Sequence, residues 1–143
     1  MASPFARQSS VIEESPAGGG DEHILIVEDD DAVRHVATLI LSNLGYKVTT
    51  FPGSMEALNY FKENENLVPM FDLLLSDMVM PFMNGRNLAK EICVLQPGIK
   101  VLFMSGYVGD ADILADMQDS DLPFLEKPFT RSTLARKVRE TLG

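Results

Sequence analysis

Residues 24–44 read ILIVEDDDAVRHVATLILSNL, and this stretch decides the fold. Its first four residues are a continuous apolar run, which is typical of a strand covered on both faces of a parallel sheet. After four acidic residues, apolar side chains recur at the spacing of one helix face. These side chains are Val33, Val36, Ala37, Ile40, Leu41 and Leu44. Gly45 follows, as is common at the end of a helix, so the stretch predicts one strand and one amphipathic helix.

The same alternation continues to the end of the chain. Further strands are predicted over residues 46–51, 73–75, 101–104 and 123–125. Three helices are predicted between these strands. Apolar side chains mark the first (Met55, Leu58 and Phe61) and the second (Leu88, Ile92 and Leu95), which stops at Pro97-Gly98. A weaker, acidic helix is predicted over roughly 110–118. Thr130 can cap a last helix that has Leu134, Val138 and Leu142 on its buried side.

Strands that alternate with helices predict right-handed βαβ units and a parallel sheet. Five repeats are too few to close an eight-stranded barrel. The predicted fold is therefore α/β, a flavodoxin-like doubly wound (βα)5 open sheet with strand order 2-1-3-4-5. Residues 1–21 are rich in Ser, Pro and Gly and are expected to form a flexible linker or disordered segment. The folded domain is expected over 22–143, and the leading linker suggests a piece of a longer protein.

Composition excludes several classes of function. The 21 acidic residues outnumber the 12 basic ones, which gives a formal net charge of −9 and disfavours direct nucleic-acid binding. No apolar run approaches the roughly 18 residues that span a bilayer, so no membrane contact by this segment is expected. Cys93 is the single cysteine of the sequence, which excludes an internal disulfide and suits the reducing cytoplasm.

Charged side chains follow the predicted strands, where a doubly wound sheet carries its functional site. Glu28 and Asp29 follow the first strand, Asp77 the third, Ser105 ends the fourth, and Lys127 follows the fifth. Two carboxylates about 4 Å apart repel by roughly 4 kcal/mol at an effective dielectric near 20. One lysine cannot balance three carboxylates, so we expect a hard divalent cation, Mg²⁺, rather than a solvated acidic loop. The sequence has no His/Cys zinc cluster, no GxxxxGK[ST] loop and no GxSxG elbow.

Four short motifs occur in one order along the chain. They are VED at 27–29, LSDMVMP at 75–81 with Asn84-Gly85, MSG at 104–106 and KPF at 127–129. In order and spacing they resemble the motifs of response-regulator receiver domains, over roughly residues 22–142. The resemblance implies that Asp77 accepts a phosphoryl group from a histidine kinase or a histidine phosphotransfer protein.

The resemblance also assigns the neighbouring residues. It implies that Glu28, Asp29, Asp77 and the backbone carbonyl of Val79 hold Mg²⁺. Ser105 would hydrogen-bond the phosphoryl oxygens and Lys127 would pair with them, while Gly106 leaves room beside Ser105. A cis Lys127–Pro128 peptide bond is implied as well.

Two positions depart from the family's usual pattern. The first acid is Glu28, where Asp is common, and the switch aromatic is Phe124, where Tyr would supply a hydroxyl. We expect Ser105 and Phe124 to form the switch, with Phe124 acting by packing alone. The acidic stretch 110–121 and the basic last helix are expected to orient a downstream or intramolecular signalling domain.

Residues 18–29 and 103–107 resemble receivers at the carboxyl end of hybrid sensor histidine kinases. In that reading the domain alone is not a turnover enzyme beyond self-phosphorylation and autodephosphorylation, and the parent protein would be a histidine kinase. The main alternative is a free-standing single-domain response regulator. Two further alternatives are a degenerate receiver that only docks and a haloacid-dehalogenase-like phosphatase, whose second acid is missing after Asp77.

Overall fold

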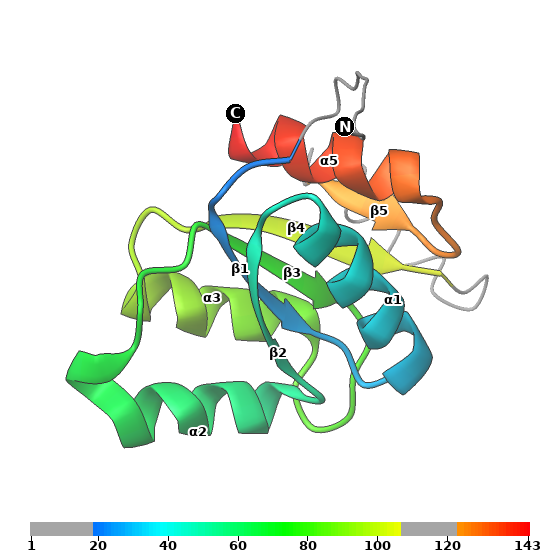
Figure 1. Ribbon diagram of the computed structural model, residues 1–143. Coiled ribbons are helices and arrows are strands. Elements are labelled where there is room, and N and C mark those ends of the chain that lie inside the picture. The colour runs from blue at the N-terminus through cyan, green and yellow to red at the C-terminus, as the bar shows by residue number, and fades with distance from the viewer. Residues whose placement is uncertain (1–18, 107–122) are drawn as a thin grey trace.

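The computed structural model describes residues 19–106 and 123–143, and its centre is one parallel sheet of five strands (Figure 1). The strand order is β2-β1-β3-β4-β5, which confirms the predicted doubly wound topology. The strands are β1 (His23–Val27), β2 (Lys47–Phe51), β3 (Leu73–Asp77), β4 (Lys100–Ser105) and β5 (Phe124–Glu126). All pairs are parallel, so every strand ends at the same edge of the sheet.

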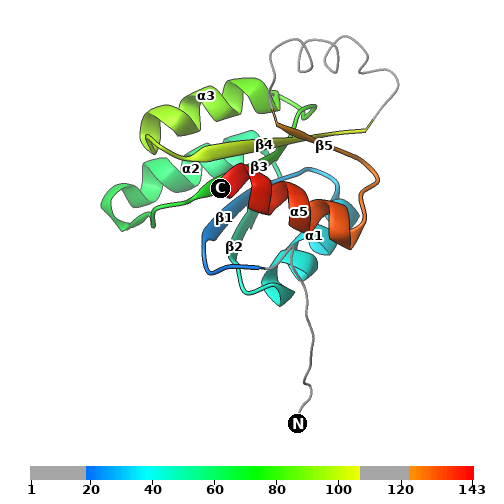
Figure 2. The same ribbon diagram turned by 90° about the horizontal axis from the view of Figure 1, so that it is seen from above.

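Helices cover both faces of the sheet, and two of the described α-helices pack on each side (Figure 2). Helices α1 (Asp31–Asn43) and α5 (Arg131–Leu142) pack on one face, and α2 (Ser54–Asn64) and α3 (Gly85–Leu95) on the other. A 3₁₀ turn, η2 (Glu65–Leu67), continues α2. The helix predicted over 110–118 lies outside the described residues. None of the described helices is long and apolar enough to cross a bilayer.

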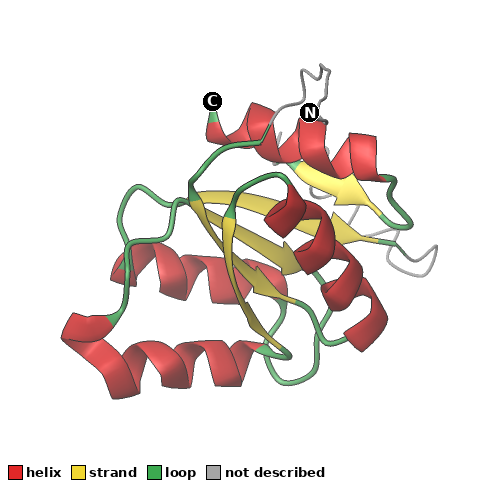
Figure 3. Cartoon of the chain, viewed as in Figure 1, coloured by secondary structure: helices red, strands yellow, loops and turns green. Residues whose placement is uncertain are grey.

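The central strands explain the unbroken apolar runs of the sequence. Alternate residues of a strand point to opposite faces. In β1, Leu25 packs with the α2 and α3 side chains, while Ile24 and Ile26 pack with those of α1 and α5. All three are fully buried. Each such side chain contributes about 1.5–3 kcal/mol by leaving water, so the layered arrangement in Figure 3 follows from two-sided burial.

Each of the five strands differs from its predicted range by one or two residues at one end or both. Tyr46 was expected in the second strand, but its backbone N–H donates to the carbonyl of Leu41 at the end of α1, so it belongs to the turn. The fifth strand runs from Phe124 rather than Pro123 and ends with Glu126 opposite Ser105. These ends are set by pairing with neighbouring segments, which no local pattern reports.

The chain enters the domain along α5, at the amino ends of the strands. The N–H of Gly20 donates to the carbonyl of Leu44 at 3.2 Å. Arg139 of α5 binds both carboxylate oxygens of Glu22, at 2.6 and 3.3 Å, and contacts the Tyr46 hydroxyl at 3.4 Å. Gly19 and Gly20 of the predicted linker therefore contact the domain. Residues 1–18 lie outside the described part, and the extent of the linker stays a prediction.

Candidate functional site

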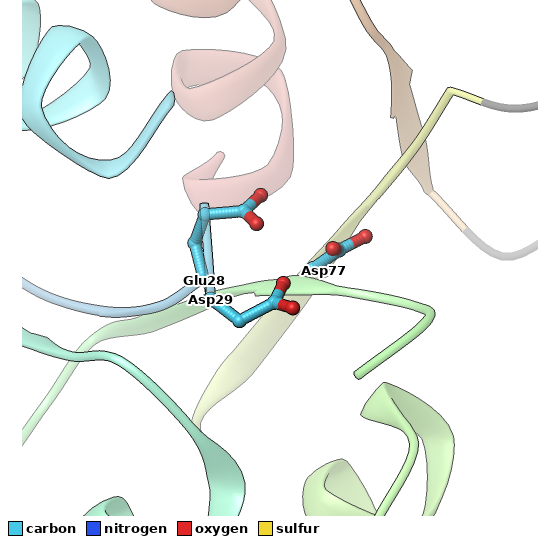
Figure 4. A group of neighbouring side chains, drawn as sticks. All are labelled: Glu28, Asp29 and Asp77. Carbon is cyan, nitrogen blue, oxygen red and sulfur yellow. The ribbon is translucent and has the colours of Figure 1, made fainter. Parts of the chain in front are cut away.

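Three carboxylates meet where β1 and β3 end. Val27 pairs with Ser76 in the sheet, so the residues that follow each of them come to lie side by side. Carboxylate oxygens of Glu28, Asp29 and Asp77 all lie within 4.8 Å of one another, and Figure 4 shows them directed into one space. Glu28 and Asp77 are buried, whereas Asp29 is exposed.

Lys127 reaches this group from the end of β5. Its Nζ lies 3.2 Å from Oε1 of Glu28 and 3.3 Å from Oδ2 of Asp77. The Lys127–Pro128 peptide bond is cis, as predicted. A Cβ at Gly106 would lie only 2.8 Å from the Cβ of Lys127. The small residue at 106 thus makes room for the lysine itself, a role that the sequence did not reveal.

Excess negative charge changes the acid–base properties of the site. The pKa of Glu28 is raised to about 7, mainly by burial and also by the charge of Asp77, while the Asp30 N–H and Lys127 act to lower it. Burial likewise raises the pKa of Asp77, although Lys127 favours its ionised form. Burial alone would lower the pKa of Lys127, but the charges of Asp77 and Glu28 outweigh it and raise that pKa. One ammonium does not balance three carboxylates, and the site favours a further cation.

Backbone groups hold the carboxylates in place. The N–H of Asp30 donates to Oε2 of Glu28 at 3.0 Å, and the N–H of Val79 donates to Oδ1 of Asp77 at 3.4 Å. Asp30 also caps α1 by accepting from the N–H groups of Ala32 and Val33. Nη1 of Arg34 donates to the Glu28 carbonyl at 2.8 Å. Sequence reasoning missed Arg34, because a charged residue on the first turn of a helix carries no distinguishing signal.

The loop from β3 to α3 passes tightly around Asp77. A Cβ at Gly85 would lie 2.2 Å from the carbonyl oxygen of Asp77, so only glycine lets α3 begin so close to the strand end. The N–H of Gly85 donates to the Met78 carbonyl at 2.9 Å. Asn84 caps α3 by accepting from the N–H of Asn87. The Asn84-Gly85 motif therefore fixes the loop after the acid.

Ser105 is buried at the end of β4, and its Oγ has no hydrogen-bond partner among the described residues. A buried hydroxyl without a partner costs about 1–3 kcal/mol. The carbonyl of Ser105 accepts from the N–H of Lys127 at 2.8 Å, which ties the two strand ends together. Phe124, the other expected switch residue, is partly buried against the core on the α2 and α3 side. The unpartnered hydroxyl leaves a donor available at this edge.

The structure brings five of the predicted site residues to one depression of about 530 Å³. Its lining includes Glu28, Asp29, Asp77, Val79 and Lys127, and also Asp30, Met80 and Pro81, which were not predicted. Ser105 lies at the neighbouring strand end, and Phe124 begins the strand that carries Lys127. The acidic stretch 110–121 of the expected output surface lies outside the described residues. On α5, Arg136 pairs with Glu140, and Arg139 pairs with Glu22 as described above.

Comparison with known proteins identifies similar chains. Residues 24–139 match the family model of the response regulator receiver domain. The sensor kinase CckA of Brucella abortus (strain 2308) is 38% identical over 112 residues, which are 78% of this chain but 12% of the kinase. The response regulator receiver protein CpdR of the same organism is 33% identical over 114 residues, 77% of this chain and 88% of that protein.

Solved structures show the same likeness. The receiver domain of the hybrid histidine kinase CckA is 34% identical with a TM-score of 0.66, covering 85% of this chain and 99% of that one. A CheY-like response regulator receiver domain protein from Methanospirillum hungatei JF-1 is 27% identical with a TM-score of 0.71, covering 86% and 94%. The similar chains thus include both a segment of a long kinase and a protein of about this length.

Proposed function

The chain belongs to the response regulator receiver domain family and is a receiver domain of two-component signalling, and from this we propose that Asp77 is its phosphoryl acceptor. The observation that carries the proposal is the position of its carboxylate. It lies at the end of the third strand, 3.3 Å from the Lys127 ammonium and next to Glu28 and Asp29. Family membership removes the haloacid-dehalogenase alternative.

Phosphoryl transfer asks a protein mainly for positioning and charge neutralisation. A carboxylate oxygen of Asp77 attacks the phosphorus of a phosphohistidine, in line with the P–N bond. That bond breaks as the new P–O bond forms, and its electron pair returns to the imidazole nitrogen. The product is an acyl phosphate on Asp77. Lys127, held between Glu28 and Asp77, neutralises charge on the incoming oxygens.

The donor set fits a magnesium ion. Glu28, Asp29 and Asp77 offer hard carboxylate oxygens within 4.8 Å of one another, and Val79 lines the same depression. We propose that these residues hold Mg²⁺, with the Val79 carbonyl as a further ligand. When bound, Mg²⁺ would neutralise the phosphoryl oxygens that Lys127 leaves uncompensated.

Ser105 and Phe124 are proposed as the switch. A phosphoryl group on Asp77 brings three acceptor oxygens to the strand edge. The Ser105 hydroxyl, without a partner among the described residues, is suited to donate to one of them. We propose that this bond moves the end of β4 and that Phe124, paired in register with Phe103 of β4, follows by packing.

For the parent protein we propose a cytoplasmic hybrid histidine kinase, in which this receiver exchanges phosphoryl groups with a kinase or phosphotransfer domain. The higher identity to CckA supports this origin. The second candidate is a single-domain regulator, which the 88% coverage of CpdR favours. The coding sequence next to Met1 distinguishes the two, because a kinase ATP-binding domain there would exclude the single-domain regulator.

Acetyl phosphate and intact-mass analysis test the central proposal. With Mg²⁺, the chain should gain one labile phosphoryl group, and Asp77→Asn should gain none. Asp72→Asn is the matched control, since Asp72 lies before β3 and accepts from the His23 N–H, which Asn can also do. Asp29→Asn should remove most of the Mg²⁺ dependence. A stable adduct that persists in Asp77→Asn would show that the acceptor lies elsewhere.

A further inference from the structure

Phe82 lies in the loop that follows Asp77 and is the most exposed large apolar side chain of the described residues, at 97%. An aromatic ring left in water forgoes the largest hydrophobic gain available to a side chain. Exposed apolar residues are common when scattered singly. Phe82 differs, because its backbone is also unfavourable.

The backbone of Phe82 is in the left-handed region, with φ of 71°. The N–H of Met83 donates to the carbonyl of Pro81 at 2.8 Å, so Phe82 is the central residue of a three-residue turn. Such turns with positive φ are rare and strained, and a bulky residue is disfavoured there where Gly or Asn is tolerated. Two features of Phe82 are therefore unfavourable, the exposure of its ring and the strain of its backbone.

The loop that carries Phe82 is fixed to the rest of the domain. Oγ of the buried Ser54 donates to the Met83 carbonyl at 2.9 Å, which ties the loop to α2. Met78 and Met80 are buried beneath it. Backbone strain that the surrounding structure maintains is concentrated at functional sites. The exposed ring of Phe82 is therefore a candidate contact with another molecule.

The position next to Asp77 indicates the partner. Asp77 lines the depression, so a phosphohistidine that reaches Asp77 through it brings the surface around that histidine against the rim. The depression is lined by the acidic Asp29 and Asp30 and also by Val79 and Pro81, which belong to the same loop as Phe82. Val79 is itself 39% exposed. A donor that covers Val79 and Pro81 meets the loop that projects Phe82.

We propose that Phe82 is the apolar anchor on which a histidine-phosphorylated protein docks when it delivers its phosphoryl group to Asp77. The inference rests on the proposed function and deepens it, because it names a residue that recognises the donor. Aromatic side chains that enter a pocket of the partner carry a large share of interface energy. Phe82 would thus govern phosphotransfer from a protein without taking part in the chemistry.

The test compares a protein donor with a small one. The protein donor is the purified, autophosphorylated histidine kinase or phosphotransfer protein of the source organism that labels the unaltered chain fastest, and the small donor is acetyl phosphate. Phe82→Asn keeps a residue that tolerates the left-handed backbone but removes the ring. Phe82→Leu keeps an apolar side chain. Leu67→Asn is the matched control, since Leu67 is 83% exposed on η2, away from the site.

Phe82→Asn should lower kcat/KM for the protein donor by about 10- to 30-fold, mainly through KM, and leave the acetyl phosphate rate unchanged. Phe82→Leu should retain most of the protein-donor rate, and Leu67→Asn all of it. An unchanged protein-donor rate in Phe82→Asn overturns the inference but leaves the proposed function intact. An equal loss with acetyl phosphate, or a self-association that Phe82→Asn abolishes, also overturns it. Failure of the unaltered chain to accept from acetyl phosphate would instead overturn the proposed function.

Discussion

The two ends of the sheet treat buried polar groups in opposite ways. At the amino ends of the strands, the buried side chain of Gln96 accepts from the Phe71 N–H at 2.7 Å and donates to the Pro69 carbonyl at 2.8 Å. Arg139 and Glu22 form a bidentate ion pair at the same end of the sheet. At the carboxyl ends, Glu28 and Asp77 share the Lys127 ammonium with Asp29 close by, and Ser105 Oγ has no partner among the described residues.

The difference separates groups that stabilise the fold from groups that we propose to bind a ligand. A paired buried amide adds about 1 kcal/mol of stability and fixes a loop. A cluster of buried carboxylates lowers stability, and burial is the main cause of the raised pKa values of Glu28 and Asp77. A chain keeps such a cluster where a cation and a phosphoryl group complete it.

The largest expected effect is the complete loss of phosphoryl acceptance in Asp77→Asn. The same variant should keep or raise the free energy of unfolding without Mg²⁺, because it removes one of three clustered carboxylates. Intact mass after treatment with acetyl phosphate and urea unfolding measure the two quantities. Destabilisation of Asp77→Asn by several kcal/mol would mean that the cluster is structural, and the contrast between the two ends would fail.

Gln96→Ala should give the opposite result at the amino end. It leaves the N–H of Phe71 without its acceptor and the carbonyl of Pro69 without its donor. We expect a loss of about 2–3 kcal/mol in the free energy of unfolding and normal phosphorylation of Asp77. Asn64→Ala is the control, because Asn64 donates only to Tyr60 of its own helix and is not buried. Equal losses in the two variants would contradict the comparison.

The pH dependence of Mg²⁺ binding should reveal the charge excess. The pKa of Glu28 is about 7 in the folded chain against 4.5 ordinarily, so the metal-free fold holds a proton that the unfolded chain loses. Metal-free stability should therefore fall as pH rises through this window. Mg²⁺ competes with that proton, and its apparent affinity should weaken by up to about tenfold between pH 7 and pH 6. Titrations followed by melting temperature measure this. Glu28→Gln should make the apparent Mg²⁺ affinity less dependent on pH. An unchanged pH dependence in this variant would mean that Glu28 is not the group that competes with Mg²⁺ for the proton.

Much of the site could be predicted because parallel strands all end at one edge. Glu28, Asp77 and Lys127 follow apolar runs that are unmistakable in the sequence, so topology alone brought them together. The strand order followed from the same alternation.

What could not be predicted depends on distances between backbones. Gly85 and Gly106 lie against Asp77 and Lys127, but a glycine in a sequence does not say what it touches. Gly20 read as linker composition and instead hydrogen-bonds Leu44. Phe82 directly follows the LSDMVMP motif, and neither its positive φ nor its exposure has a local sequence signal.

The smallest expected effect compares two buried serines. Ser54 donates to the Met83 carbonyl at 2.9 Å, whereas Ser105 Oγ has no partner in the described part of the chain. Ser54→Ala leaves a carbonyl unpaired and should cost about 1 kcal/mol in the free energy of unfolding. Ser105→Ala removes a buried hydroxyl that bonds nothing described, so the free energy of unfolding should stay unchanged or rise. Urea unfolding of the unphosphorylated variants measures both. Ser105→Ala should also reduce the chemical-shift changes that phosphorylation causes at Phe103 and Phe124, because the hydroxyl acts only once the phosphoryl oxygens arrive. If Ser105→Ala were as destabilising as Ser54→Ala and left those shifts unchanged, Ser105 would be an ordinary core residue and the switch would lie elsewhere.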